Sequence, residues 1–199
     1  MTQGIAAKVI SEYERKLHVP DIKPPIQYIL CPVGLIGSGK TTVVTALCKE
    51  LSLVRISSDD VGEIIHTQEF PNDLVVLTEI MEELFSKYLD LGYSVAADTD
   101  CGTSSNQEFL QEKKEKYGLQ LVWIHINPPE TFILNVGLKN KPEWLFKDKN
   151  EVIEIYTRRK KVHEKLSIPF VYTFDTSLPN VGEQINEASQ LIKGQGFAI

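Results

Sequence analysis

Short apolar runs alternate with longer amphipathic segments along most of the chain. Five runs typical of buried strands lie at 26–31, 53–57, 93–98, 119–127 and 170–175. Apolar residues at helical spacing predict helices at 4–17, 41–51, 73–92, 104–118, 129–138, 150–166 and 180–193. Strands that alternate with helices predict an α/β domain with a five-stranded, mainly parallel sheet and helices on both faces.

The chain ahead of the first strand has a different organisation. The predicted helix over 4–17 is followed by PDIKPP at 20–25, a proline-rich linker. We therefore expect an N-terminal helix and linker over 1–25, and a single domain over 26–199.

Each predicted strand ends in a polar cluster. The five clusters read GLIGSGKT, SSDD, DTD, NPP and DTS. Ligands of open parallel sheets bind beyond the carboxyl ends of the strands, so these clusters predict one active-site edge.

The first cluster, residues 34–41, fits the phosphate-loop pattern G-x-x-x-x-G-K-[ST]. Glycines let backbone N–H groups surround phosphate oxygens, and the helix that starts near Lys40 points its positive end at the same anion. Lys40 is expected to reach the β- and γ-phosphates, and the Thr41 hydroxyl to bind Mg²⁺. The residues expected to hold the nucleotide are Gly34, Gly37, Ser38, Gly39, Lys40, Thr41 and Thr42.

ATP is the expected nucleoside triphosphate, with GTP as the alternative. A GTPase needs a guanine-reading N-K-x-D segment, and NKP at 140–142 lacks the required Asp. The pattern therefore weakens a GTPase interpretation.

Carboxylates follow the second and third strands. Asp59, with Asp60 as second choice, is expected to accept the proton of an alcohol hydroxyl and to align its oxygen with the γ-phosphorus. Asp98 ends the apolar run YSVAAD, where a single carboxylate suits an Mg²⁺-water ligand or an acceptor-site residue.

The net charge of −6 and the sequence pI near 5.3 argue against nucleic-acid binding driven by overall charge. Three scattered cysteines without a C-x-x-C pair indicate reduced thiols. No apolar run is long enough to span a membrane, and the N-terminus lacks a signal-peptide core. We therefore expect a soluble cytoplasmic protein without a membrane partner.

GLIGSGKTT, then a strand ending in SSDD and another ending in AADTD, resembles the polynucleotide-kinase and zeta-toxin branch of small P-loop kinases, which are AAA-33-like ATP-binding proteins. The segment that begins ILCPVG and ends GKTT is most similar in sequence to tRNA-ligase kinase domains. The resemblance implies a three-layer P-loop NTPase fold with an adenylate-kinase-like core. It also implies that Asp59 is the general base and that Asp98 organises the acceptor side.

The chain departs from this family at two places. Family members often carry an arginine about three residues after the base, where this chain has Gly62 followed by Glu63. Polynucleotide kinases tend to carry arginines after the third-strand carboxylate, and DTDCGTSSNQEF has none. These departures make a neutral small-molecule alcohol plausible as the acceptor, as well as a nucleic acid held by lysines.

Kinases of this type close a mobile lid over the nucleotide, which brings cations to the transferring phosphoryl group. By position, the lid is expected at about 135–160, a lysine-rich stretch. Arg158 and Arg159 are the only arginines in the downstream half of the chain. They are therefore the candidates for stabilising transition-state charge.

The sequence favours a Mg²⁺- and ATP-dependent phosphotransferase that acts on an alcohol hydroxyl. A polynucleotide 5′-hydroxyl kinase is the alternative among enzymes. A nucleotide-binding regulator or slow NTPase without an acceptor is the alternative from another class. The acceptor, the oligomeric state and the role of the N-terminal helix are left open.

Overall fold

The computed structural model describes residues 2–70, 74–139 and 148–196. One sheet is formed by β1 (Tyr28–Val33), β2 (Val54–Ser57), β3 (Val95–Asp98), β4 (Gln120–Ile126) and β5 (Tyr172–Phe174). Its strands pair in parallel in the order β2-β3-β1-β4-β5. The predicted five-stranded sheet is confirmed, and all its pairings are parallel.

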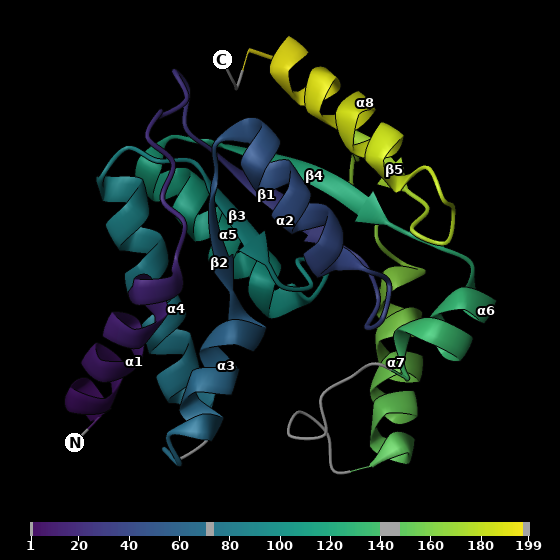
Figure 1. Cartoon of the computed structure of the whole chain (residues 1–199), viewed down its shortest axis with the longest axis horizontal. Helices are drawn as coiled ribbons and strands as arrows, with labels where there is room; N and C mark the ends of the chain where they lie inside the picture. Colours follow the sequence, from purple (N-terminus) through teal and green to yellow (C-terminus); the bar gives the residue numbers. More distant parts are fainter. Residues whose placement is uncertain (1, 71–73, 140–147, 197–199) are drawn as a thin grey trace.

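Helices pack on both faces of the sheet, as predicted (Figure 1). They are α1 (Thr2–Lys16), α2 (Lys40–Leu51), α3 (Ser58–Thr67), α4 (Leu74–Asp90), α5 (Ser104–Tyr117), α6 (Glu130–Phe132), the π-helical turn η1 (Ile133–Gly137), α7 (Lys149–His163) and α8 (Val181–Gly194). None of these helices, as far as the structure describes them, has the length and apolar character needed to cross a bilayer.

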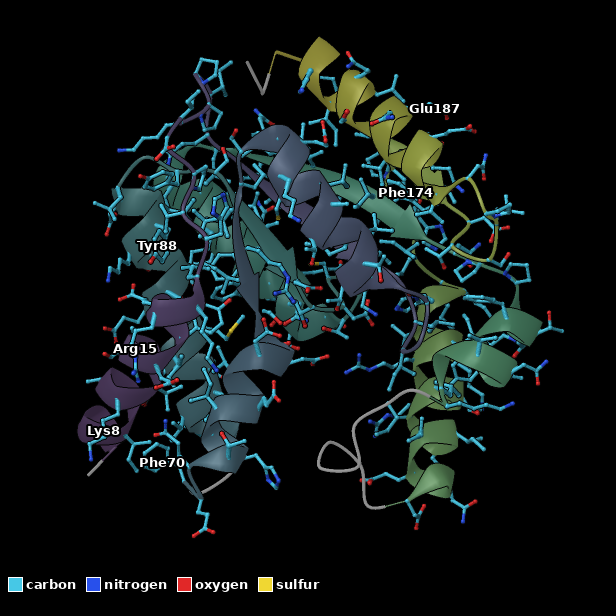
Figure 2. All side chains as sticks on the ribbon, in the orientation of Figure 1. Lys8, Arg15, Phe70, Tyr88, Phe174 and Glu187 are labelled. Atoms are coloured by element: carbon cyan, nitrogen blue, oxygen red, sulfur yellow. The ribbon has the colours of Figure 1, made fainter. Side chains whose placement is uncertain are left out.

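The central strand β1 is buried on both faces, as a parallel strand between two helical layers must be. Tyr28 and Leu30 pack in the cluster that contains α2 and α8, whereas Ile29 and Cys31 pack in the cluster that contains α4 and α5. On the α8 side, Phe174 of β5 is fully buried beside that helix (Figure 2). The two clusters pack on opposite faces of the sheet and place the strand ends relative to the helices.

The N-terminal helix α1 packs with α3 and α4 against one side of the sheet (Figure 1). Val9 and Tyr13 are buried in the same core cluster as the residues of β2. The Tyr13 hydroxyl donates to the Arg55 carbonyl at 3.0 Å and accepts from the Ser57 amide at 2.9 Å. Because β2 is an edge strand, these bonds satisfy backbone groups that would otherwise lack a partner in the sheet.

Two elements differ from the sequence expectation. The SSDD cluster begins a separate helix, α3, which is capped by the Ser57 side chain accepting from the Asp60 amide at 3.2 Å. The single helix expected over 129–138 is instead the short α6 followed by η1. Residues 140–147 of the expected lid lie outside the described residues.

Candidate active site

The phosphate loop connects β1 to α2, and its shape depends on two glycines. Gly37 has φ 79° and Gly39 has φ 88°, a region that favours glycine. A Cβ on Gly39 would also meet the Thr176 side chain at 3.1 Å. The Thr176 hydroxyl donates to the Ser38 carbonyl at 2.7 Å, so the segment after β5 supports the loop from outside.

Lys40 curls back over this loop. Its Nζ donates to the Gly34 carbonyl at 2.8 Å and to the Leu35 carbonyl at 3.0 Å. The Ser38 hydroxyl is buried and has no hydrogen-bond partner within the described residues. A loop with left-handed glycines, a convergent lysine and an unsatisfied buried hydroxyl fits a phosphate group.

A cavity of about 480 Å³ lies beside the loop at the carboxyl ends of the strands. Of the residues predicted from the sequence, those that line it are Gly37, Gly39, Lys40, Thr41, Thr42, Asp59, Asp98 and Arg159. Gly34, Ser38 and Arg158 do not line it, although Gly34 and Ser38 belong to the adjoining loop. Arg158 is exposed and makes no ion pair within the described chain. Residues from α3, β3 and α7 therefore converge on the phosphate loop.

Asp98 lies close to Thr41 at the base of this cavity. The Thr41 hydroxyl donates to Asp98 Oδ1 at 3.4 Å, and the Asp98 side chain is only 3% exposed. Burial raises the pKa of Asp98, while the neighbouring charges of Arg55 and Lys40 oppose that rise. Hydroxyl and carboxylate oxygens are hard ligands that suit Mg²⁺ together with nucleotide phosphates. Across the described residues, no group of three or more His, Cys, Asp or Glu could hold a metal ion.

Arg55 is a site residue that sequence reasoning missed. Its Nε and Nη2 lie 2.8 Å and 2.6 Å from Asp98 Oδ2, so Asp98 Oδ1 is left facing Thr41. A charged side chain inside a short apolar strand was the available signal. Its partner could not be identified from the sequence, because Arg55 and Asp98 meet only through the pairing of β2 with β3.

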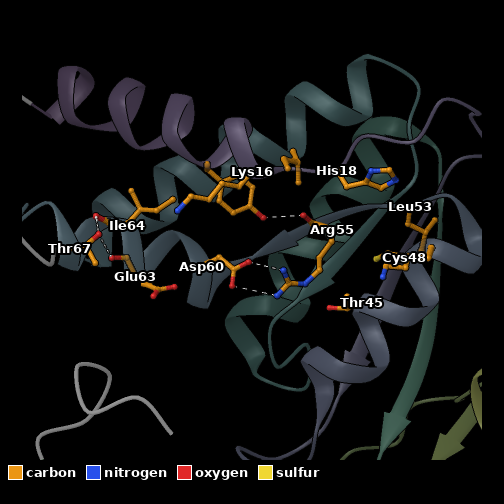
Figure 3. A pocket seen from close by; sticks show the side chains of 13 residues that line it. Lys16, His18, Thr45, Cys48, Leu53, Arg55, Asp60, Glu63, Ile64 and Thr67 are labelled. Atoms are coloured by element: carbon orange, nitrogen blue, oxygen red, sulfur yellow. Dashed lines mark hydrogen bonds and ion pairs between the residues drawn. The ribbon is translucent and has the colours of Figure 1, made fainter. Parts of the chain in front are cut away.

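The two adjacent carboxylates after β2 have different surroundings. Asp60 Oδ2 pairs with Arg55 Nη1 at 2.7 Å, and the close view shows Asp60 turned toward that guanidinium (Figure 3). Asp60 lines a second cavity, of about 460 Å³, between α1, α2, α3 and β2. Asp59 lines the cavity of the phosphate loop and makes no hydrogen bond or ion pair with the described residues. Arg55 thus separates two carboxylates that the sequence alone left as alternatives.

Asp100 is a further cavity residue that the sequence analysis did not select. Its Oδ2 lies 3.0 Å from His163 Nε2 and 3.5 Å from Arg159 Nη1, both on α7. Burial alone would raise the pKa of Asp100, but the His163 hydrogen bond and the charges of Lys40 and Arg159 lower it. The second carboxylate of the DTD cluster was visible in the sequence, but its partners lie about sixty residues later.

The turn η1, where the expected lid begins, packs directly against the phosphate loop. A Cβ on Gly37 would lie 2.8 Å from the carbonyl carbon of Gly137, and a Cβ on Gly137 would overlap the Gly37 carbonyl. The backbone of η1 can approach the loop this closely because both positions are glycine.

This fold and this site define a small P-loop kinase-like ATP-binding protein. A family model described as an AAA domain, AAA_33, matches residues 29–135, which is more than half of the chain. The protein belongs to this family. No curated protein matches the sequence.

Several solved structures of similar fold are kinases at low sequence identity. The APS kinase CysC of Mycobacterium tuberculosis, in complex with AMPPNP and APS, has a TM-score of 0.58 at 14% identity, over 85% of this chain and 99% of that chain. A gluconokinase from Sinorhizobium meliloti has a TM-score of 0.56 at 14% identity, over 88% of this chain and 95% of that chain. A shikimate kinase from Bacteroides thetaiotaomicron has a TM-score of 0.51 at 16% identity, over 85% of this chain and 97% of that chain. These likenesses support the fold assignment.

Proposed function

We propose that this protein transfers the γ-phosphate of ATP to the hydroxyl group of an alcohol. The observation that carries the proposal is the position of Asp59. It is a carboxylate without a partner among the described residues, and it shares one cavity with Lys40 and Thr41. A carboxylate in that position can accept the hydroxyl proton while the phosphate loop holds the donor.

Each proposed role follows from a contact in the cavity. Lys40 can leave the loop carbonyls and bind the transferring phosphate. Thr41 and the Oδ1 atom of Asp98 would hold Mg²⁺, which when bound neutralises phosphate charge. Arg159 is the α7 arginine that lines the cavity, so it is the candidate for stabilising charge on the phosphoryl group.

The surroundings of the arginines favour a small alcohol without an anionic group near its hydroxyl. Arg55 is paired with Asp98 and Asp60, and Arg159 with Asp100. Arg55 does not line the cavity, and Arg159 is assigned to the transferring phosphate, so neither of these two arginines is left for a separate acceptor phosphate, as a 5′-hydroxyl nucleic acid would require. Matched acceptors with and without a neighbouring phosphate test this preference. Better transfer to the phosphorylated one, with steep loss of affinity at high salt, would favour the polynucleotide alternative.

Paired substitutions of the two adjacent carboxylates test the assignment of the base. Asp59→Asn should lower the rate of transfer by about 10²- to 10⁴-fold, the usual contribution of general base catalysis, while ATP affinity is retained. Asp60→Asn is the matched control, because it removes a neighbouring carboxylate that pairs with Arg55 outside the cavity. A larger loss in Asp60→Asn than in Asp59→Asn would reverse the assignment.

A further inference from the structure

Two side chains on one face of α7 contact Asp100, in the loop that follows β3. Arg159 and His163 are four residues apart, so their side chains lie on the same side of the helix. Both reach the same oxygen of Asp100, at 3.5 Å from Arg159 Nη1 and 3.0 Å from His163 Nε2. The Asp100 side chain is 1% exposed, whereas that of Arg159 is 39% exposed and lines the cavity. Asp100 also lines this cavity, so the buried carboxylate and the more exposed guanidinium meet at its wall.

The loop that carries Asp100 is itself anchored to the sheet. The Gly102 amide donates to Asp100 Oδ1 at 3.1 Å, and the Asn106 side chain donates to the Asp100 carbonyl at 2.8 Å. The next amide, that of Cys101, donates to the Pro32 carbonyl of β1 at 2.9 Å. Asp100 is therefore a fixed point relative to the phosphate loop, which continues from β1.

The contact between this loop and α7 is close. A Cβ on Gly102 would lie 3.0 Å from His163 Nε2 and 3.0 Å from Leu166 Cδ1, so the absence of a side chain there lets α7 approach. On another side of the helix, Lys160 donates to Glu130 of α6 at 2.8 Å. Two separate anchors therefore define how α7 lies over the cavity.

We propose that Asp100 is the positioning residue for Arg159, holding its guanidinium in the cavity before the nucleotide binds. This inference rests on the proposed phosphotransferase function, in which Arg159 meets the transferring phosphate. An arginine side chain loses rotamer freedom when it binds a phosphate, and a pre-formed contact removes part of that loss in advance. Only one guanidinium nitrogen faces Asp100, so the other nitrogens stay available to phosphate oxygens.

A first test measures the contact without any reaction. The chain has only four arginines, Arg15, Arg55, Arg158 and Arg159, so ¹⁵N relaxation of their Nε–H groups gives a simple spectrum. In the wild type, Arg159 should be as ordered as Arg55 and more ordered than the exposed Arg158. Asp100→Asn should make Arg159 as mobile as Arg158 while Arg55 stays unchanged. An Arg159 that is already as mobile as Arg158 in the wild type would overturn the proposal, with no variant needed.

A second test separates positioning from binding in steady-state kinetics. Asp100→Asn should lower kcat by about 10²-fold, the expected cost of misplacing a catalytic group by about 1 Å, while the KM for ATP changes little. Arg159→Ala should lower kcat by at least as much. Adding Asp100→Asn to Arg159→Ala should lower kcat little further. Lys161→Ala, which removes an exposed α7 cation without partners among the described residues, is the matched control and should behave like the wild type. Losses that multiply in the double variant would refute the assignment.

Chemical rescue completes the test. Guanidinium ions should restore part of the activity of Arg159→Ala, because Asp100 still offers a site for them in the cavity. The same ions should not rescue the Asp100→Asn/Arg159→Ala double variant, and equal rescue of both would contradict the proposal. Absence of transfer in the wild type would refute the proposed function instead, and the relaxation measurement would still decide the contact.

Discussion

Arg55 neutralises a buried carboxylate beside the phosphate loop, so Arg55→Gln should destabilise the whole fold. The Asp98 side chain is 3% exposed, and Arg55 Nη2 and Nε lie 2.6 Å and 2.8 Å from its Oδ2 atom. Breaking a buried pair by removing one partner costs about 3–5 kcal/mol. Because the Arg55 side chain is itself 22% exposed, we expect the lower end, about 3 kcal/mol. Asp60→Asn removes the other partner of Arg55, which is 44% exposed, and should cost less than about 1 kcal/mol.

Urea unfolding followed by circular dichroism measures these differences. With a slope of about 1–3 kcal/mol per molar urea, Arg55→Gln should unfold at least about 1 M earlier than the wild type. Adding Asp98→Asn should restore much of the loss, because it removes the unpaired buried charge. Burial raises the pKa of Asp98, and the variant lacks the Arg55 charge that lowers it, so the deficit should shrink as the pH falls and Asp98 becomes protonated in both proteins. A deficit equal to that of Asp60→Asn, or no recovery in the double variant, would refute this account of the pair.

Three further predictions concern the edge strand, the lid and the pH dependence. Tyr13→Phe should cost about 1–3 kcal/mol in urea unfolding, because it leaves the buried Ser57 amide unpaired; an unchanged midpoint would contradict this. Gly137→Ala should weaken binding of a fluorescent ATP analogue, because its Cβ would overlap the phosphate loop. Gly182→Ala, with open space around its Cβ, should leave binding unchanged and stabilise α8 by up to about 1 kcal/mol; equal binding by both variants would exclude the packing argument. The pKa of Asp100 is lowered by its partners, so its stabilisation should be present above the pKa of an unfolded aspartate and lost as the pH falls through the lowered value. Unfolding midpoints of wild type and Asp100→Asn should therefore converge in acid, and a constant gap would contradict the pKa shift.

The phosphate loop was predictable from the sequence because its chemistry is local. Glycines at 37 and 39 and the Lys40–Thr41 pair lie within one short stretch, and their backbone conformations follow from residue type. The alternation of strands and helices likewise predicted the layers and the strands, since each run carries its own periodicity. Helix α3 was missed because its apolar stripe, Val61, Ile64 and Ile65, is short and directly follows a strand.

The rest of the site depends on contacts between distant segments. Asp59 and Asp60 look equivalent in sequence, and only the position of Arg55 on β2 distinguishes them. Asp100 and Arg159 are 59 residues apart, and no local pattern marks them as partners. Arg158 and Arg159 were indistinguishable until the rotation of α7 placed one of them in the cavity. Predicting these features requires the strand order and helix packing, which side-chain type alone does not determine.

Transfer of the γ-phosphate to an alcohol is the central claim, and a label-transfer screen tests it most directly. The protein would be incubated with γ-labelled ATP, Mg²⁺ and separate panels of neutral alcohols, nucleosides, anionic alcohols and 5′-hydroxyl oligonucleotides, beside the Asp59→Asn variant. We predict label on a neutral alcohol with the wild type, and about 10²- to 10⁴-fold slower labelling with Asp59→Asn although it still binds ATP. Release of labelled inorganic phosphate alone, at a rate that no added alcohol changes, would contradict the claim and indicate a slow NTPase.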